Sequence, residues 1–159
     1  MNENQDKKKL QILMIDDDLM LLKLYEMTAR THEEITFLTA TNTVDGDKIA
    51  REQRPDVILL DLILGKEPDT PVTEVDKNHG FNFLIMLKAD PEIKDIPVII
   101  LSNLDTKQDH DRAKELQAAD YIVKAKTTPE DVFRAAKGAA DIAGAEKKIR
   151  DAQDKLGTV

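Results

Sequence analysis

Val57-Ile58-Leu59-Leu60-Asp61 is the stretch that decides the fold. Its apolar residues form an unbroken run that includes β-branched side chains, and such a run predicts a strand buried on both faces. Pro55 fits a loop that leads into this strand. In open α/β sheets, ligands bind beyond the carboxyl ends of the strands. We therefore expect Asp61 to be placed for chemistry rather than for packing.

Other apolar runs also end in polar side chains. The run Ile12-Leu13-Met14-Ile15 is followed by Asp16 and Asp17, Val98-Ile99-Ile100-Leu101 by Ser102, and Tyr121-Ile122-Val123 by Lys124. If these strands are parallel neighbours, their carboxyl ends meet at one edge of the sheet. The sequence therefore predicts that acids, a hydroxyl and an amine converge there.

Composition bounds the class of protein. A length of 159 residues predicts one domain with a proper core. The formal net charge of -8 disfavours nonspecific nucleic-acid binding, and an acidic sheet edge would suit a divalent cation. The sequence has no cysteine, and Asn2 to Lys9 carry no apolar signal segment. No apolar run approaches the ~20 residues that span a bilayer, so we expect a cytoplasmic protein without membrane insertion.

Strand and helix patterns alternate along the chain, which predicts a doubly wound five-stranded parallel sheet with five helices in an α/β fold. Asp18 is expected to cap the first helix, and Thr128 the last. The expected strands are Leu10–Ile15, Ile35–Ala40, Val57–Leu60, Pro97–Leu101 and Asp120–Val123. The expected helices are Leu19–Arg30, Val44–Gln53, Phe81–Lys88, Thr106–Ala118 and a last helix from Pro129 towards Leu156.

The connection after Asp61 is unusual. Loops between a strand and a helix usually have about 2–6 residues, whereas no helical pattern returns here before Phe81. We interpret residues 65–79 as an insertion with two alternatives: a lid or partner-recognition loop beside Asp61, or a mobile solvated loop. His79 in this segment is not expected to be a ligand or a phosphohistidine.

The converging residues suit phosphoryl chemistry. Carboxylate oxygens with room for water are typical Mg²⁺ ligands. Clustered carboxylates repel one another, and a dication with a nearby lysine would keep Asp61 ionised. An ionised carboxylate can attack phosphorus in line and become an aspartyl phosphate. Lys124 and the Ser102 hydroxyl would then contact the phosphoryl oxygens.

These residues resemble the receiver domains of two-component response regulators, the family that includes the chemotaxis regulator. The matching motifs are Ile-Asp16-Asp17 after the first strand, Asp61 in VILLDLIL, Gly80-Phe81, Ser102 closing IILS, and Tyr121-Ile-Val-Lys124. The resemblance covers roughly Leu10 to Ala143. It implies a flavodoxin-like fold with strand order 2-1-3-4-5.

The resemblance also implies roles and partners. Asp61 would accept a phosphoryl group from a histidine kinase or a histidine phosphotransfer protein, and a downstream protein would read the result. Mg²⁺ would bind Asp17, Asp61 and the backbone carbonyl of Ile63, with Asp16 acting through water. Lys124 would pair with the phosphoryl group. Ser102 and Tyr121 would form the switch, the hydroxyl moving onto the phosphate while the ring turns inward.

The chain departs from the family pattern at two positions beside this site. Ala125 follows Lys124, where a proline is usual. Asn103 follows Ser102, where a small residue is common, and its larger side chain would narrow access for water or for the phosphodonor.

The end of the chain overshoots a domain of this kind. We expect a receiver domain over residues 1–143 and a helical extension over 144–159. Ile142, Ile149 and Leu156 recur at heptad spacing, although Glu146 and Gln153 interrupt the seam. The extension either pairs with a partner or a second copy of the chain, or is a frayed, charged end.

Two other functions are consistent with parts of the sequence. A receiver fold that binds partners without phosphorylation would need no magnesium. A haloacid-dehalogenase-type phosphohydrolase would use Asp16-x-Asp18, but it leaves Asp61 without a role and lacks the further acidic pair. Magnesium binding that needs Asp17 and Asp61 separates both alternatives from the phosphoacceptor.

Overall fold

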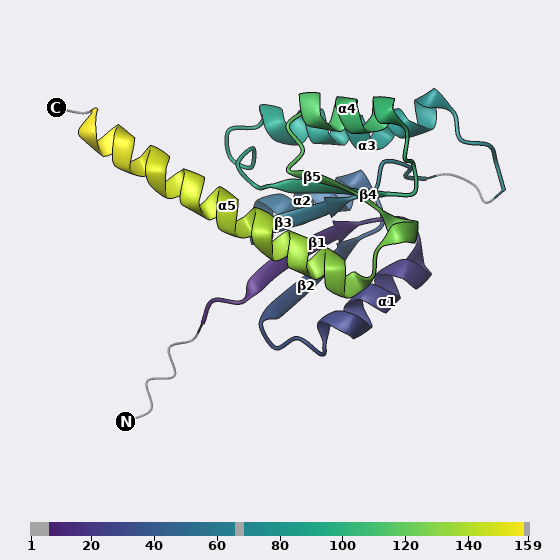
Figure 1. The fold of residues 1–159 in the computed structure, drawn as a ribbon, viewed down its shortest axis with the longest axis horizontal. Helices are drawn as coiled ribbons and strands as arrows, with labels where there is room; N and C mark the ends of the chain where they lie inside the picture. The colour runs from purple at the N-terminus through teal and green to yellow at the C-terminus, as the bar shows by residue number, and fades with distance from the viewer. Residues whose placement is uncertain (1–6, 66–68, 158–159) are drawn as a thin grey trace.

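The computed structural model describes residues 7–65 and 69–157. Its centre is a parallel five-stranded sheet of order β2-β1-β3-β4-β5 (Figure 1). The strands are β1 (Leu10–Ile15), β2 (Ile35–Ala40), β3 (Val57–Leu60), β4 (Val98–Ser102) and β5 (Asp120–Val123). The helices are α1 (Leu19–Ala29), α2 (Thr43–Gln53), α3 (Glu74–Ala89), α4 (Lys107–Glu115) and α5 (Pro129–Leu156), with a 3₁₀ turn, η1 (Lys124–Lys126). The predicted fold class and strand order are confirmed.

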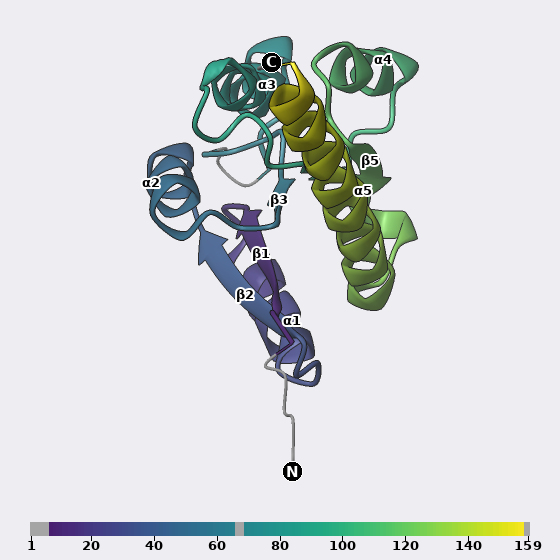
Figure 2. The ribbon, with the colours of Figure 1, turned by 90° about the vertical axis from the view of Figure 1, so that its left-hand side faces the viewer.

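Alternating residues of the central strands face two separate cores. Leu13 and Leu60 pack with side chains of α2, α3 and α4, whereas Met14 and Leu59 pack with side chains of α1 and α5. Figure 2 shows the sheet between these two layers of helices. Because β1, β3 and β4 are covered on both faces, their side chains are nearly continuous apolar runs. This burial fixes the carboxyl ends of the strands in one place.

Most predicted elements have the expected bounds. Strands β1, β2, β3 and β5 agree with the prediction to the residue, and α5 begins at Pro129 with Thr128 as its cap. Asp18 caps α1 as expected, accepting hydrogen bonds from the backbone N–H groups of Met20 and Leu21. Strand β4 begins and ends one residue later than predicted, so Ser102 is its last residue.

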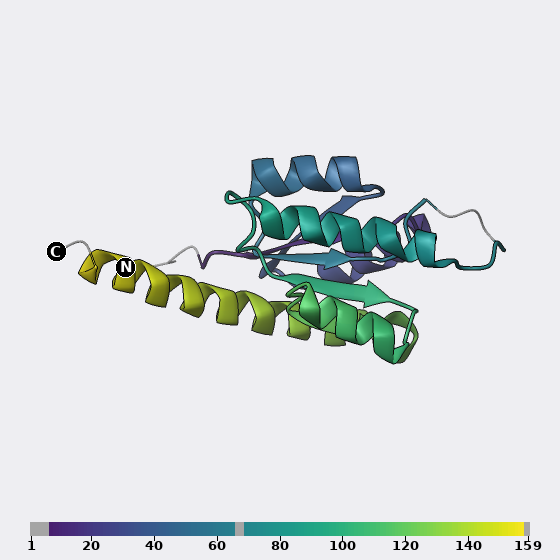
Figure 3. The same ribbon diagram turned by 90° about the horizontal axis from the view of Figure 1, so that it is seen from above.

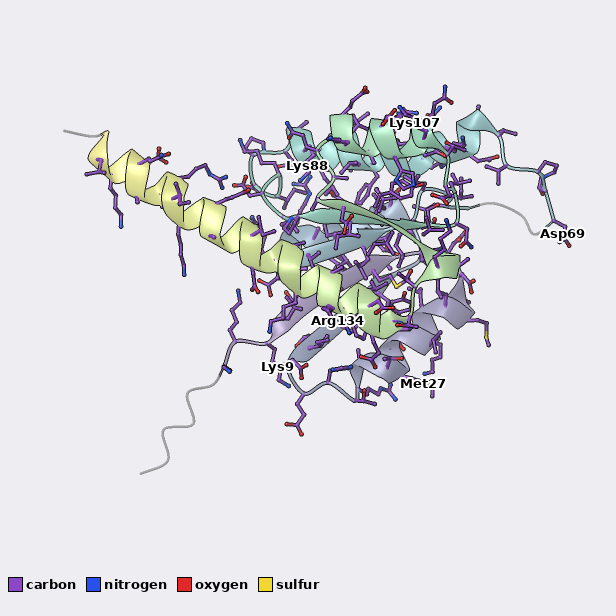
Figure 4. All side chains as sticks on the ribbon, in the orientation of Figure 1. Lys9, Met27, Asp69, Lys88, Lys107 and Arg134 are labelled. Atoms are coloured by element: carbon purple, nitrogen blue, oxygen red, sulfur yellow. The ribbon has the colours of Figure 1, made fainter. Side chains whose placement is uncertain are left out.

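The predicted start of α3 at Phe81 is wrong. The helix begins at Glu74, so the expected insertion over 65–79 includes the first turns of α3, and residues 66–68 lie outside the described residues. Thr73 and Asp76 form a reciprocal capping box that starts the helix. Asp69, which precedes this cap, lies well away from the sheet (Figure 4).

The early start of α3 brings its first turns against α4. Lys77 Nζ lies 3.3 Å from Asp109 Oδ1, and both side chains are largely buried. Arg112 donates a hydrogen bond of 2.8 Å to Asn78 and lies over the Phe81 ring, 4.4 Å from its centroid. These contacts explain why the first turns of α3 are polar, before the apolar periodicity begins at Phe81.

The predicted end of α4 at Ala118 is also wrong. The helix ends at Glu115, because Gln117 takes a positive φ of 63°. The N–H group of Ala118 then bonds to the carbonyl oxygen of Ala113 and closes the turn before β5.

Helix α5 continues far past the sheet. Its C-terminal part projects from the end of the molecule opposite to the carboxyl ends of the strands (Figure 3). Ile142, Ile149 and Leu156 are 62%, 58% and 78% exposed on this helix. Among the described residues, no helix has the length and apolar character that crossing a membrane requires.

Candidate functional site

The sheet register places the predicted site residues at neighbouring strand ends. Ile15 pairs with Leu60 between β1 and β3, and Leu60 pairs with Ile100 between β3 and β4. Ser102 pairs with Val123 between β4 and β5. The structure therefore brings together the residues at the carboxyl ends of these strands: Asp16, Asp17, Asp61, Ser102 and Lys124.

The three acids form a compact cluster. One carboxylate oxygen from each of Asp16, Asp17 and Asp61 lies within 4.8 Å of the others. Asp16 is 1% exposed and Asp61 7%, so both carboxyl groups lie below the surface, whereas Asp17 is more accessible. Asp17 Oδ2 accepts a hydrogen bond of 2.8 Å from the N–H group of Gly65. This contact, from the loop after β3, holds Asp17 beside the other acids.

Lys124 is the cation of the cluster. Its Nζ lies 2.5 Å from Asp16 Oδ2 and 3.1 Å from Asp61 Oδ2, and its side chain is 15% exposed. Burial lowers the pKa of Lys124, but the negative charges of Asp61 and Asp16 raise the pKa above its ordinary value. The ammonium group therefore stays charged and links the two buried carboxyl groups.

Burial gives Asp61 unusual proton affinity. Removal from water raises the pKa of the Asp61 carboxyl to about 7, although Lys124 opposes this effect, and the charge of Asp16 raises it further. The N–H group of Ile63 points at Asp61 Oδ1 over a long 3.4 Å. At neutral pH the Asp61 carboxyl group is therefore partly protonated, unless a second cation beside Lys124 favours its ionised form.

The donor set fits magnesium. Mg²⁺ prefers hard oxygen ligands and keeps several waters, and this cluster offers three carboxylates that line an open cleft of about 510 Å³. The acidic cluster is consistent with the magnesium site of a receiver domain. Ile63 lines the same cleft, and the part played by its backbone carbonyl stays a prediction.

Ser102 and Tyr121 meet at one residue, Leu104, which the sequence did not single out. Ser102 Oγ accepts a hydrogen bond of 3.3 Å from the N–H group of Leu104. The Tyr121 hydroxyl donates a hydrogen bond of 2.7 Å to the carbonyl oxygen of Leu104. The ring of His110 stacks on Tyr121 with centroids 4.0 Å apart. The Ser102 hydroxyl is thus connected through the backbone of Leu104 to Tyr121, and through the His110 ring to α4.

The two unusual residues of the sequence are also in contact. The N–H group of Ala125 donates a hydrogen bond of 3.0 Å to Asn103 Oδ1. The described peptide bonds are all trans, including that between Lys124 and Ala125. The lysine nevertheless reaches both buried acids without a proline after it.

Comparison with known proteins identifies the family. Residues 12–137 match the model of the response regulator receiver domain. The chain belongs to this family. A receiver domain of this kind is a two-component signalling protein and not a classical enzyme.

Similar proteins agree with that assignment. The receiver is 32% identical to Protein PilH of Pseudomonas aeruginosa over 72% of this chain and 84% of that protein. It is 30% identical to the polar-differentiation response regulator DivK of Brucella anthropi, over 74% of this chain and 86% of the relative. The chain is thus a response regulator that resembles these two relatives over most of their length.

Solved structures agree on the fold alone. The signal receiver domain of a putative Luxo repressor protein from Vibrio parahaemolyticus matches with a TM-score of 0.71 at 18% identity, covering 89% of this chain and 97% of that one. A CheY-like receiver domain protein from Methanospirillum hungatei matches with a TM-score of 0.69 at 20% identity, covering 88% and 99%.

Proposed function

We propose that Asp61 is the phosphoacceptor of this receiver domain. The observation that carries the proposal is the convergence of Asp61 with two further acids, Lys124 and Ser102 at one sheet edge. An Asp61 oxygen would attack phosphorus in line. The bond from oxygen to phosphorus forms while the bond from phosphorus to the imidazole nitrogen of a phosphohistidine breaks, and that nitrogen keeps the electron pair.

Charge neutralisation is what this chain supplies to the reaction. With a pKa of about 7, Asp61 would be about half protonated at neutral pH and a poor nucleophile. Asp16, Asp17 and Asp61 would hold Mg²⁺, which supplies positive charge to the phosphoryl oxygens and favours ionised Asp61. Lys124 would turn from Asp61 to the phosphoryl group, and the Ser102 hydroxyl would donate a hydrogen bond to it.

A receiver domain implies a histidine kinase partner, and we propose a kinase or a histidine phosphotransfer protein as the donor. We propose α4, β5 and α5 as the surface that a downstream protein reads. The contacts that support this are those of Leu104 with Ser102 and Tyr121. When Ser102 turns to the phosphoryl group, the N–H group of Leu104 loses its acceptor, and the conformation that the partner binds more tightly becomes more populated.

The cytoplasm remains the expected location.

Magnesium binding tests the metal part of this proposal. Replacing Asp17 or Asp61 by Asn should weaken Mg²⁺ binding about tenfold or more, because each removes a charged oxygen ligand. Asp18→Asn is the matched control, since Asn caps a helix as well as Asp does and should leave the affinity unchanged. Titration of Mg²⁺ followed by calorimetry measures all three variants.

The same titration separates the alternatives. Binding that ignores Asp61 but needs Asp18 would favour the phosphohydrolase alternative over the receiver mechanism. A wild-type chain that binds no Mg²⁺ at millimolar concentration would favour a receiver fold used for binding alone. The use of Asp18 as a helix cap already argues against a catalytic role for that residue.

We propose a second copy of the chain as the partner of the helical extension. The exposed stripe Ile142, Ile149 and Leu156 lies at the heptad spacing that pairs helices. Light scattering should show a mass that rises from 17.9 kDa towards twice that value with concentration. Ile149→Glu should keep the chain at 17.9 kDa, whereas Lys147→Glu, off the stripe, should not. A wild-type mass that never rises would rule out this pairing.

A further inference from the structure

Asn103 and Ala125 form one feature of the site rather than two separate departures from the family pattern. The N–H group of Ala125 donates to Asn103 Oδ1 at 3.0 Å. A proline at position 125 has no N–H group, and a small residue at position 103 has no side-chain acceptor. The hydrogen bond therefore requires both departures, a residue other than proline at position 125 and a side-chain acceptor at position 103.

This hydrogen bond fixes the orientation of the Asn103 carboxamide. A carboxamide has an oxygen that accepts and an NH₂ group that donates, and both lie in one plane on different bonds of the same carbon atom. Because Ala125 offers a donor, the oxygen faces it, and the NH₂ group points away from the Ala125 N–H group. Within residues 7–65 and 69–157, the Asn103 NH₂ group donates no hydrogen bond.

The free NH₂ group belongs to a side chain that lines the site. Asn103 borders the same cleft as Asp61, Ser102 and Lys124. It follows Ser102 directly, at the end of β4, and the residue that holds it follows Lys124. The feature thus joins the residues that follow Ser102 and Lys124, the two residues that the proposed mechanism assigns to the phosphoryl oxygens.

We propose that Asn103 is a further phosphoryl-binding residue, oriented by the N–H group of Ala125. Its NH₂ group donates a hydrogen bond to a phosphoryl oxygen on Asp61, beside Ser102 and Lys124. A hydrogen bond between a neutral donor and a charged oxygen is stronger than one between neutral groups. This inference rests on the proposed phosphoacceptor role of Asp61.

The feature is not needed to hold the fold together. Asn103 and Ala125 are both exposed, and β4 and β5 are already joined by the pairing of Ser102 with Val123. Variants at these positions should therefore fold, and their effects can be assigned to the site.

The first test is the rate of phosphorylation by acetyl phosphate at saturating Mg²⁺. Asn103→Ala should lower the rate about tenfold, the effect expected for a lost hydrogen bond to a charged group. Asn103→Asp should lower it further, because it keeps an acceptor for Ala125 but replaces the donor with a negative charge. Ala125→Pro should lower the rate in the wild-type background and have little further effect beside Asn103→Ala.

The second test needs no phosphoryl transfer. Beryllofluoride with Mg²⁺ imitates a phosphoryl group on a carboxylate, and its binding can be followed by fluorine NMR. Asn103→Ala should weaken beryllofluoride binding about tenfold and leave the affinity for Mg²⁺ alone unchanged.

These measurements separate the inference from the proposed function. If the wild-type chain binds beryllofluoride but takes no phosphoryl group, the transfer proposal fails, and the beryllofluoride series still decides the role of Asn103. If the wild-type chain does neither, both proposals fail. Rates and affinities of Asn103→Ala within twofold of wild type, or independent effects of Asn103→Ala and Ala125→Pro, would overturn the inference.

Discussion

Lys124→Met should cost about 3 kcal/mol of folding free energy at pH 7.5 without Mg²⁺, the magnitude of a buried ion pair that loses one partner. Lys124 is the cation that touches both Asp16 and Asp61, and its loss leaves two buried carboxyl groups facing each other. The loss should shrink as the pH falls, because both carboxyl groups can then take up protons, and Mg²⁺ should restore part of it. Urea unfolding over a series of pH values measures the effect.

Lys126→Met is the matched control for this prediction. Lys126 also pairs with an acid, Asp105, at 2.6 Å, but its side chain is 70% exposed. An exposed ion pair contributes at most about 1 kcal/mol. If Lys124→Met cost no more than Lys126→Met, the buried charge cluster would not have the energetic role assigned to it.

Gly80→Ala should have the second largest effect. A Cβ atom at position 80 would lie 2.5 Å from the Cα of Leu62 and 2.7 Å from the carbonyl oxygen of Asp61. Both are backbone atoms, so the segment after β3 must move. We expect the folding free energy to fall by about 3 kcal/mol, at the upper end of overpacking costs, and the melting temperature to fall by roughly 6 to 12 °C. Mg²⁺ binding should weaken as well, because Asp61 moves with this segment.

Gly144→Ala provides the opposite expectation. Gly144 lies in α5 with nothing within 4 Å of an added Cβ atom. Replacing a helical glycine by alanine should stabilise the chain by up to about 1 kcal/mol. Calorimetric melting of both variants decides the matter, and equal melting temperatures would contradict the close approach of α3 to the segment after Asp61.

The strand ends were predictable because two constraints coincide there. Burial on both faces requires continuous apolar runs, and the first polar residue after each run then marks the carboxyl end of the strand. Asp16, Asp61 and Lys124 therefore stood out without any knowledge of the pairing. The parallel register aligns those strand ends at one edge of the sheet and so brings the three side chains together.

The start of α3 was not predictable from apolar periodicity. Its first turns are polar because they are held by Lys77 with Asp109 and by Arg112 with Asn78, partners that lie far away in the sequence. The capping box of Thr73 and Asp76 is the local sequence signal for the start of this helix. Local capping chemistry thus located this helix better than its hydrophobic pattern.

The contacts made through backbone groups could not be predicted from the sequence either. Leu104 joins Ser102 to Tyr121 through its backbone N–H group and its carbonyl oxygen, and every residue except proline has both. The hydrogen bond from Ala125 to Asn103 is of the same kind. A sequence pattern marks side-chain chemistry and leaves such backbone partners unmarked, so the site was predicted without the links between its parts.

The central claim is that Asp61 accepts a phosphoryl group. The most direct measurement is the intact mass of the chain after incubation with Mg²⁺ and acetyl phosphate, beside Asp61→Asn and beside a sample with chelator. The account predicts a gain of one phosphoryl group that is absent from Asp61→Asn and absent with chelator. An unchanged mass in the wild-type chain, or an equal gain in Asp61→Asn, would contradict it.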